Sequence, residues 1–490
     1  MFGNGKTALR GGFGVAYEGT LYNPLSNSRW DLPYYSFNQV IGGVEQSGTD
    51  IVYGPSVCDG TGAANCHQVS NVPVVFTGPP TNPNQGPPNQ SQASGNIDGW
   101  DPTNPNQATL TGIVFPKGVR DPYVYNFYLG IQHEILPKTV LDVKYVGTAG
   151  HKLFRAEDVN REPGSYLPCF KDGFCASTTD NFGRTLHGLG GRLNQNYGRL
   201  RAWENAVNSN YSSLQASVKH QMSHGLLFNV DYTYSHSIDN GSTWHSGATT
   251  SNGAAAGEGF TLDQTLPGLD RGDSVYDIRN RLVLNYVYQL PGYNLKGALG
   301  AVLGGWSYNG IWSFQSGAHF ETYITSGPKF REISNSANKC TELDWQTANC
   351  QNVGGDFNLD GGRNDRPSAS VPRLGGITHD QWANGWFAAA TPVNITFSAP
   401  CLGCTANLGR NTFVGPGQWY ADMTLSKTFK FTERVNMKFD ANGFNVFNHT
   451  NFLLATAGGG AHNKFTSGNF GQAAGTLNPR QIQIGVKISF

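Results

Sequence analysis

The final ten residues, QIQIGVKISF, are the stretch that most constrains how this chain can fold. Apolar side chains alternate with polar or small ones from Gln481 to the terminal Phe490. Successive side chains of a strand point to opposite faces, so this segment predicts a strand with one oily face and one hydrated face. Such a strand can cover a soluble core or face a bilayer. Whether the pattern recurs at membrane-spanning length distinguishes the two.

The alternation does recur, at the length of about 9 to 11 residues that a tilted transmembrane strand needs. In 434–447 an apolar row opposes a row that contains Arg434, Lys438 and Asp440, which no soluble core would enclose. In 419–430 only Lys427 interrupts the apolar row, near the expected membrane boundary. Ten strands are predicted, at 7–18, 121–135, 139–153, 209–222, 225–237, 277–290, 304–316, 417–430, 434–447 and 479–490. The predicted fold class is all-β, an antiparallel transmembrane β-barrel.

Composition agrees with this fold class. Charged residues make up 14% of the chain, against about 25% in ordinary soluble domains. The formal net charge is zero, so nothing favours a nucleic-acid partner. No run approaches the roughly 18 apolar residues of a membrane helix, as expected if strands cross the bilayer.

Short and long links alternate between the predicted strands. The short ones lie near 136–138, 223–224, 291–303 and 431–433. Long loops are expected at about 19–120, 155–208, 238–276, 317–416 and 448–478. Outer-membrane barrels have short periplasmic turns and long extracellular loops. The short links therefore mark the periplasmic side, and the even strand count places both ends there.

All eight cysteines fall in the long links, as close pairs. The pairs are Cys58 with Cys66, Cys169 with Cys175, Cys340 with Cys350, and Cys401 with Cys404. Locally paired cysteines in even number predict disulfides in an oxidising compartment. The alternative is metal or thiol-redox chemistry at Cys401-Leu-Gly-Cys404. No second Cys-x-x-Cys and no clustered histidine accompanies that motif, so disulfides are favoured.

Several segments resemble a known family of outer-membrane proteins. They are GQWYADMTLSKTFKFTERVNMKFDANGFNVFNHTNF (417–452), NLGRNTF (407–413), SNYSSLQASVKHQMSHGLLFNVDYTYSHSID (209–239), RGDSVYDIRNRLVLNYVYQLP (271–291) and PYVYNFYLGIQHEI (122–135). Together they resemble the C-terminal barrel of TonB-dependent receptors of the Oar-like group. The resemblance implies a signal peptide, a regulatory-like domain, a TonB box and a plug, followed by a barrel of 22 strands.

The chain departs from that family pattern at its beginning. MFGNGKTALR (1–10) has no charged-then-apolar export signal, and nothing before it could be a plug. Residues 1–490 are therefore interpreted as the C-terminal part of a larger barrel, without plug and signal peptide. A truncated reading frame and an unusually small closed barrel stay as alternatives.

One loop carries a pattern that calcium loops share. Asp356, Asn358 and Asp360 place oxygen ligands at alternate positions before a glycine turn, and Asp365 could add a carboxylate. Position twelve is Pro367, so the segment is not an EF-hand. Bound Ca²⁺ is one hypothesis, and a solvated Asp/Asn/Gly turn is the other.

The sequence gives weaker indications of function for several other side chains. Aromatic rings favour the bilayer boundary, where strands of a barrel end. The rings near predicted strand ends are Tyr123, Tyr125, Trp306, Trp419, Tyr420 and Phe490. Trp382, Trp386 and Phe387 lie in the longest loop, where packing in a small loop core is favoured over stacking on a sugar or peptide. Polar residues expected to line the lumen are Asn229, Asp231, Arg434, Lys438 and Asp440. We find no Gly-x-Ser-x-Gly motif and no other catalytic pattern, so an enzyme is not indicated.

These observations favour the barrel portion of an outer-membrane receptor or transporter in the bacterial outer membrane. The expected partners are outer-membrane lipid, the TonB energy-coupling system through upstream parts of the parent protein, and an unknown solute, glycan or peptide. One alternative is a surface adhesion or structural barrel that displays its loops. A second is a secreted soluble β-protein that binds glycans, which would purify without detergent. The sequence does not identify ligand-binding residues.

Overall fold

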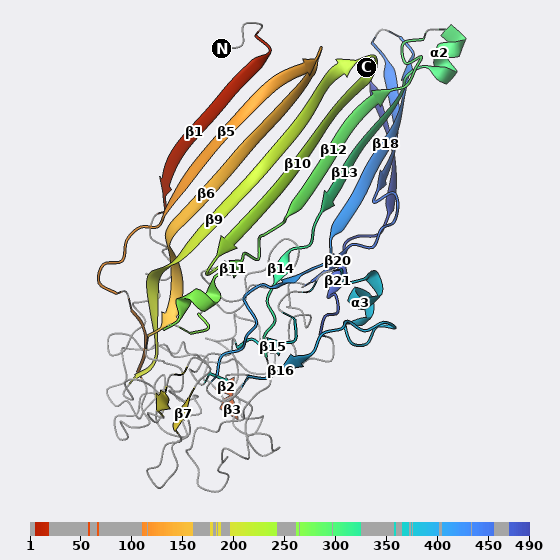
Figure 1. Cartoon of the computed structure of the whole chain (residues 1–490). Helices are drawn as coiled ribbons and strands as arrows, with labels where there is room; N and C mark the ends of the chain where they lie inside the picture. The colour runs from red at the N-terminus through yellow and green to blue at the C-terminus, as the bar shows by residue number, and fades with distance from the viewer. Residues whose placement is uncertain are drawn as a thin grey trace.

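The structure is a computed structural model. It describes residues 5–18, 57–58, 66–67, 110–114, 116–159, 177–179, 183, 185–187, 197–242, 261–263, 265–295, 297–324, 357–358, 365–371, 374, 376–400, 404–432, 434–454 and 470–490. Ten long strands form one curved sheet (Figure 1). They are β1 Thr7–Tyr17, β5 Tyr123–Leu136, β6 Thr139–Asp158, β9 Tyr197–Ser223, β10 Leu226–Asp239, β12 Asn280–Gln289, β13 Trp306–Gln315, β18 Gln418–Lys430, β19 Asn436–Phe444 and β22 Gln481–Ser489.

Each long strand pairs antiparallel with the next long strand along the chain, in the order β1-β5-β6-β9-β10-β12-β13-β18-β19-β22. All ten predicted strands are present, and the predicted antiparallel arrangement is confirmed. Among the described strands, β1 and β22 lie at the two ends of this path.

Tight turns at one end of the sheet explain the meander. Lys138 follows Pro137 between β5 and β6 with φ of 64°, and His224 and Gly225 between β9 and β10 have φ of 51° and 81°. Two successive positive φ values are typical of the type I′ hairpin, whose twist matches that of its strands. We call this the turn end. The large links leave from the opposite end, which we call the loop end (Figure 1).

Strand register assigns every long-strand side chain to one of two faces. On β10 and β12, Val230 lies opposite Leu284, and Asn229 lies opposite Asn285. Residues directly opposite in an antiparallel pair share a face, so the apolar rows join into one apolar face and the polar rows into one polar face. Large apolar side chains on the apolar face are exposed to the surroundings of the sheet, among them Phe13 at 70%, Leu129 at 59% and Ile484 at 67%.

Aromatic rings are concentrated at the loop end of the apolar face. Tyr123 and Tyr125 are 5.3 Å apart between ring centroids, and Trp419 lies 5.9 Å from Phe314. Trp306 lies at the turn end of β13, eight residues before Phe314, or about 26 Å along a strand at ~3.3 Å per residue. Tyr420 differs from the expected boundary rings, because its register opposite Ser313 places it on the polar face.

One hydrophobic core cluster of the described residues lies outside the ten long strands. Its buried members are Ala318, Phe320, Trp382, Trp386, Val393, Ile395, Leu408, Phe413, Phe452, Leu454 and Phe470. The apolar strand face therefore does not close on a dry interior within the described part of the chain. A soluble sandwich would require that closure.

Short elements frame the loop core and the other large links. They are β2 Val57–Cys58, β3 Cys66–His67, β4 Leu110–Val114, β7 Ser177–Thr179, β8 Thr185–His187, β11 Gly272–Asp273, β14 His319–Phe320, β15 Ser368–Ala369, β16 Phe397–Ser398, β17 Phe413–Val414, β20 Phe452–Leu453 and β21 Gly475–Thr476, with the 3-10 helix η3 Pro267–Asp270 and helices α2 Gly297–Leu303 and α3 His379–Asn384. Thr378 and Gln381 form a capping box at the start of α3. None of the described helices is long and apolar enough to span a membrane.

The structure corrects one predicted loop boundary and places elements inside two other expected links. β6 and β9 continue to Asp158 and back to Tyr197, inside the expected loop 155–208, because their ends pair with each other and bury Trp203. β4 lies inside the expected loop 19–120 and pairs in parallel with β9. The expected turn at 291–303 contains α2. The strand ends at 155–158 and 197–208 lack strict alternation, so the period-two pattern does not detect them.

Candidate functional site

The polar face carries a small charged pocket between β5 and β10. Register aligns Gln132, Asp142, Ser217 and Asp231 in one row across four strands. Lys144 and Lys219 complete the charged lining of a pocket of about 170 Å³, together with Gln132, Val140, Asp142, Ser217 and Asp231. Two ammonium groups and two carboxylates make this pocket suited to polar or zwitterionic contacts.

Paired polar side chains continue along the same face toward β22. The Asp440 carboxylate accepts a hydrogen bond from Ser426 Oγ at 2.5 Å and pairs with Lys438 Nζ at 2.8 Å. Four of the five residues expected to line the lumen, Asn229, Asp231, Lys438 and Asp440, therefore lie on the polar face. Arg434 precedes β19 and is exposed.

A second candidate site lies at the loop end, where buried arginines and carboxylates join several links. We call it the rim cluster, and it consists of Arg155, Glu157, Asp239, Asp270, Glu321, Arg366 and Arg410. Arg155 comes from the end of β6, Asp239 from the end of β10, and Asp270 from η3. Arg366 and Arg410 belong to the link between β13 and β18. Of these, Arg366 is 1% exposed and Arg155 is 3% exposed.

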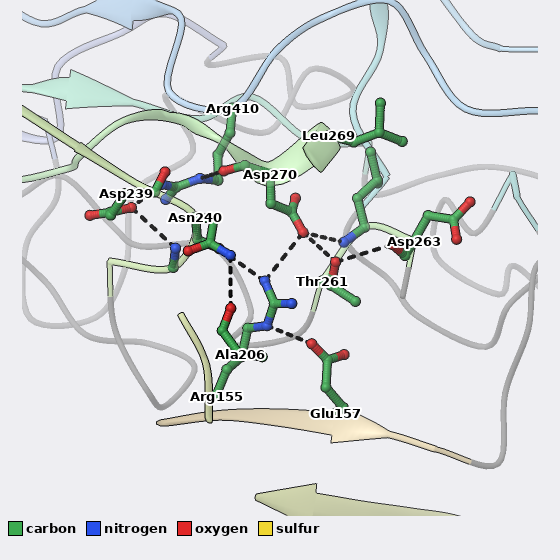
Figure 2. Close-up of polar contacts among 12 residues, drawn as sticks. Arg155, Glu157, Ala206, Asp239, Asn240, Thr261, Asp263, Leu269, Asp270 and Arg410 are labelled. Atoms are coloured by element: carbon green, nitrogen blue, oxygen red, sulfur yellow. Dashed lines mark hydrogen bonds and ion pairs between the residues drawn. The ribbon is translucent and has the colours of Figure 1, made fainter. Parts of the chain in front are cut away.

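Asp270 is the centre of the rim cluster (Figure 2). Its carboxylate lies 3.0 Å from Arg366 Nη2 and 3.6 Å from Arg155 Nη1, and it accepts hydrogen bonds from the Thr261 hydroxyl and the Leu262 amide. Arg155 Nε also lies 2.5 Å from Glu157 Oε1. Charges this deeply buried are tolerated only when they are paired.

Arg410 connects the link between β13 and β18 to the end of β10 and to the link between β10 and β12. Its Nε donates to the Asp270 carbonyl at 2.7 Å, and its Nη2 donates to the Asp239 carbonyl at 2.8 Å. Nη2 also pairs with the Asp239 carboxylate, and Nη1 donates to Ser242 Oγ at 3.1 Å. One guanidinium thereby fixes three separate segments, as its planar fork of donors allows.

Glu321 completes the rim cluster. Burial raises the pKa of its carboxyl above the ordinary value, while the nearby Arg366 and Arg410 oppose that rise. Its Oε1 lies 3.4 Å from Arg366 Nε. Arg366 is thus shared between the carboxyl groups of Glu321 and Asp270.

A histidine cluster adjoins the rim cluster and consists of His236, Asp273, Asp277, Arg279 and His319. Asp277 Oδ2 lies 2.8 Å from Arg279 Nε and 3.3 Å from both His236 Nδ1 and His319 Nε2. His319 Nδ1 is 3.0 Å from the Asn411 carbonyl, which can only accept a hydrogen bond. This cluster thus joins β10 and the segment before β12 to the link between β13 and β18.

Metal binding is one chemical possibility for the histidine cluster. Ligand atoms of His236, Asp273 and Asp277 lie within 4.8 Å of one another. Arg279 Nη2, however, is 3.3 Å from Asp273 Oδ1, and Arg279 Nε pairs with Asp277. Because the guanidinium already supplies the positive charge that a cation would bring, the geometry favours a structural ion-pair cluster.

Trp382 and Trp386 of the longest loop are buried in a loop core, as predicted, but this core also contains Phe452, Leu454 and Phe470 from the link between β19 and β22. Trp382 and Trp386 are 2% and 0% exposed, and Trp386 packs 5.4 Å from Phe413 and 5.3 Å from Phe470. Gly471 has φ of 72°, and a Cβ there would lie 2.3 Å from the Trp386 ring, so glycine is needed at that contact. Phe387 differs from the two tryptophans because it is 46% exposed.

Two of the predicted calcium ligands lie close together. Asp365 Oδ2 accepts the amide hydrogens of Phe357 and, at 2.8 Å, of Asn358. Asn358 Nδ2 donates to the Leu262 carbonyl at 2.8 Å. These contacts close a hydrogen-bonded turn. Asp356 and Asp360 lie outside the described residues, and the calcium site stays a prediction.

The cysteine pairs are described only in part. Cys58 and Cys66 are backbone partners in the β2–β3 pair. Cys404 is 2% exposed. Cys169, Cys175, Cys340, Cys350 and Cys401 lie outside the described residues, so the disulfides stay a prediction.

Sequence patterns missed the rim and histidine clusters. Their members are scattered through the large links, and the contact between Arg410 and Asp239 spans 171 residues. No spacing rule connects positions so far apart. The available signal was the presence of Asp, Arg and His in loops close to strand ends, and this signal is weak.

Comparison with known proteins places these features in context. A family model described as an outer membrane beta barrel domain matches residues 1–483. No curated protein matches the chain.

Three similar solved structures are an outer membrane transporter and two receptors. The outer membrane transporter YddB from Escherichia coli has 10% identity and a TM-score of 0.36, over 78% of this chain and 34% of that chain. The ferripyoverdine receptor of Pseudomonas aeruginosa has 10% identity and a TM-score of 0.31, over 75% and 27%. The ferric-catecholate import receptor Fiu from E. coli K12 has 9% identity and a TM-score of 0.30, over 76% and 29%. The match thus covers about a third or less of each of these chains.

Proposed function

This chain belongs to the outer membrane beta barrel domain family and lies in the bacterial outer membrane, and from that premise we propose that it is the barrel portion of an Oar-like TonB-dependent receptor. In this proposal the large links capture a solute at the cell surface, and the polar face lines the route inward. No catalytic reaction is assigned to it.

The charged pocket on the polar face is the observation that carries the proposal. A barrel that only anchors surface loops needs an apolar outer face, and its interior can be filled in many ways. Here the polar face presents the charged pocket with Asp142, Lys144, Lys219 and Asp231. Fixed charges on a hydrated wall are suited to contact with a polar solute or with a plug.

The loop end supports a role in solute capture because contacts between its links already order them without a ligand. The aromatic core around Trp386 and the rim cluster around Asp270 give these links a defined arrangement. Surfaces that are already ordered lose less conformational entropy on binding. The solute in this proposal is a small polar molecule, glycan or peptide.

Energy coupling would come from parts of a longer polypeptide. Among the described strands, β1 and β22 each pair with one long-strand neighbour, and open strand edges are not tolerated in a bilayer. We propose that further strands close this barrel and that a plug responds to TonB.

The proposal is tested in the native bacterium by deleting the gene and measuring entry of labelled solutes, namely a panel of glycans, peptides and small metal chelates. Deletion should abolish entry of one class. A protonophore should stop entry of that class while leaving surface binding intact, because TonB uses the proton-motive force. The matched control is complementation with the native gene.

Two outcomes would reject the proposal. Surface binding without protonophore-sensitive entry of any solute would instead support a barrel that displays its loops. Release of the protein from cells without detergent would support the soluble alternative.

A further inference from the structure

The short helix α2, Gly297–Leu303, is apolar throughout, and yet none of its residues is buried. Its sequence is GALGAVL. Leu299 and Val302 are each 68% exposed, Leu303 is 55% exposed, and the preceding Leu295 is 48% exposed. An isolated helix of seven residues is marginal in water, so both its composition and its length argue for a nonpolar surrounding.

Lys427 attaches the end of α2 to the apolar face. In the register of β18, Lys427 lies opposite Trp306 on β13 and Phe439 on β19, so its side chain starts from the apolar face. Its ammonium group donates to the carbonyl of Val302 at 3.0 Å and to the carbonyl of Gly304. The side chain is nevertheless buried, with the residue 3% exposed.

These contacts explain how a lysine is tolerated on the apolar face. The last carbonyls of a helix have no partner within the helix and carry partial negative charge, which a lysine ammonium satisfies. Trp306 Nε1 also donates to the Val302 carbonyl at 3.0 Å, and Lys427 Nζ lies 5.1 Å from the rings of Trp306 and Phe429. The C-terminal end of α2 is thus held beside the apolar face, at the turn end (Figure 1).

We propose that α2 is a lipid-contacting anchor that lies in the membrane interface on the periplasmic side. Its occupant is phospholipid acyl chain, because the helix continues the apolar face that already meets the bilayer in this outer-membrane family. The short links mark the periplasmic end, so the lipid belongs to the inner leaflet. The inference uses the membrane location of the family and is independent of the transported solute.

Site-specific photo-crosslinking in a bilayer tests the proposal. Benzoylphenylalanine replaces Leu299 in one variant and Val302 in a second, in the full chain reconstituted into phosphatidylethanolamine vesicles with a clickable acyl chain. Position 284 on β12 is the positive control, since Leu284 lies on the apolar face. Position 311 on β13 is the negative control, since Ile311 is 51% exposed but shares the polar face with Asp422.

The expected result is lipid adducts at 299 and 302 in yields similar to those at 284, and no lipid adducts at 311. Adducts at 284 without adducts at 299 or 302 would overturn the anchor and leave the membrane barrel intact. Crosslinks from 299 to another protein would overturn it too, in favour of a protein partner. Absence of adducts at all four positions would overturn the anchor together with the lipid-facing assignment of the whole apolar face.

Discussion

Individual arginines carry many of the contacts that join the large links at the loop end. Arg410 alone connects Asp239, Ser242 and the backbone of Asp270. Removal of one member of a buried ion pair leaves its partner charge buried and unpaired, whereas replacement of the whole pair by apolar groups is often tolerated. Single substitutions in the rim cluster should therefore destabilise the protein more than single substitutions at exposed ion pairs do.

Arg410→Met should destabilise the loop assembly by about 3 to 5 kcal/mol, because the Asp239 carboxylate then stays buried without its guanidinium. Hydrogen exchange in detergent micelles should show faster exchange in 239–242 and 265–275, with β5, β6 and residues 226–237 of β10 unchanged. Arg281→Met is the matched control, since Arg281 is exposed. Equal effects of the two substitutions would contradict the assigned role of Arg410.

The raised pKa of the Glu321 carboxyl predicts that loop stability decreases as pH rises. Burial raises the pKa of this carboxyl above the ordinary value of 4.5, so the folded state holds a proton that the unfolded state releases. The free energy of unfolding should then fall as pH rises from 4.5 through the raised pKa.

Glu321→Gln should remove this slope, because glutamine stays neutral at every pH. Thermal unfolding measured at a series of pH values should show variant and native protein alike below 4.5 and the variant increasingly more stable above it. Asp121→Asn, at an exposed position, should leave the slope unchanged. A slope that persists in Glu321→Gln would show that another group causes it.

At the scale of elements, the long strands and the loop core are stabilised by different surroundings. The strands expose their apolar face and rely on inter-strand hydrogen bonds and the bilayer. The loop core buries aromatic rings from α3, β14, β17 and β20 within the protein. The loop assembly is therefore expected to lose its structure without loss of the sheet.

Trp386→Ala tests that separation. Removal of a fully buried indole should cost about 3 to 5 kcal/mol, and limited proteolysis should then cleave the link between β13 and β18 while the sheet remains folded. Phe387→Ala, at the neighbouring residue that is 46% exposed, should have a much smaller effect. Similar cleavage in both variants would argue against a specific core around Trp386.

At the scale of the whole molecule, the two faces of the sheet contact different surroundings, lipid on the apolar face and water on the polar face. Successive side chains of a strand point to opposite faces, so adjacent residues meet different surroundings. Leu284 and Asn285 are neighbours near the middle of β12, on the apolar and the polar face respectively.

Leu284→Arg should therefore impair folding into lipid vesicles much more than Asn285→Arg. The cost of arginine on the lipid face near the bilayer centre is about 2 to 4 kcal/mol, whereas a hydrated lumen accepts the charge. Urea unfolding in vesicles measures both variants against the native chain. A larger loss for Asn285→Arg would reverse the assignment of the two faces.

The sequence by itself determined the ten strands, their antiparallel order and the two-faced character of each, because side-chain alternation is a local property with a period of two residues. The same reasoning located the tryptophans of the loop core, since large rings in a long loop need burial. Only the tertiary structure decided the extension of β6 and β9, the rim and histidine clusters, and the position of α2. These depend on contacts between residues up to 171 positions apart, and the polar loop residues that make them have no periodic pattern that distinguishes a buried partner from a solvated one.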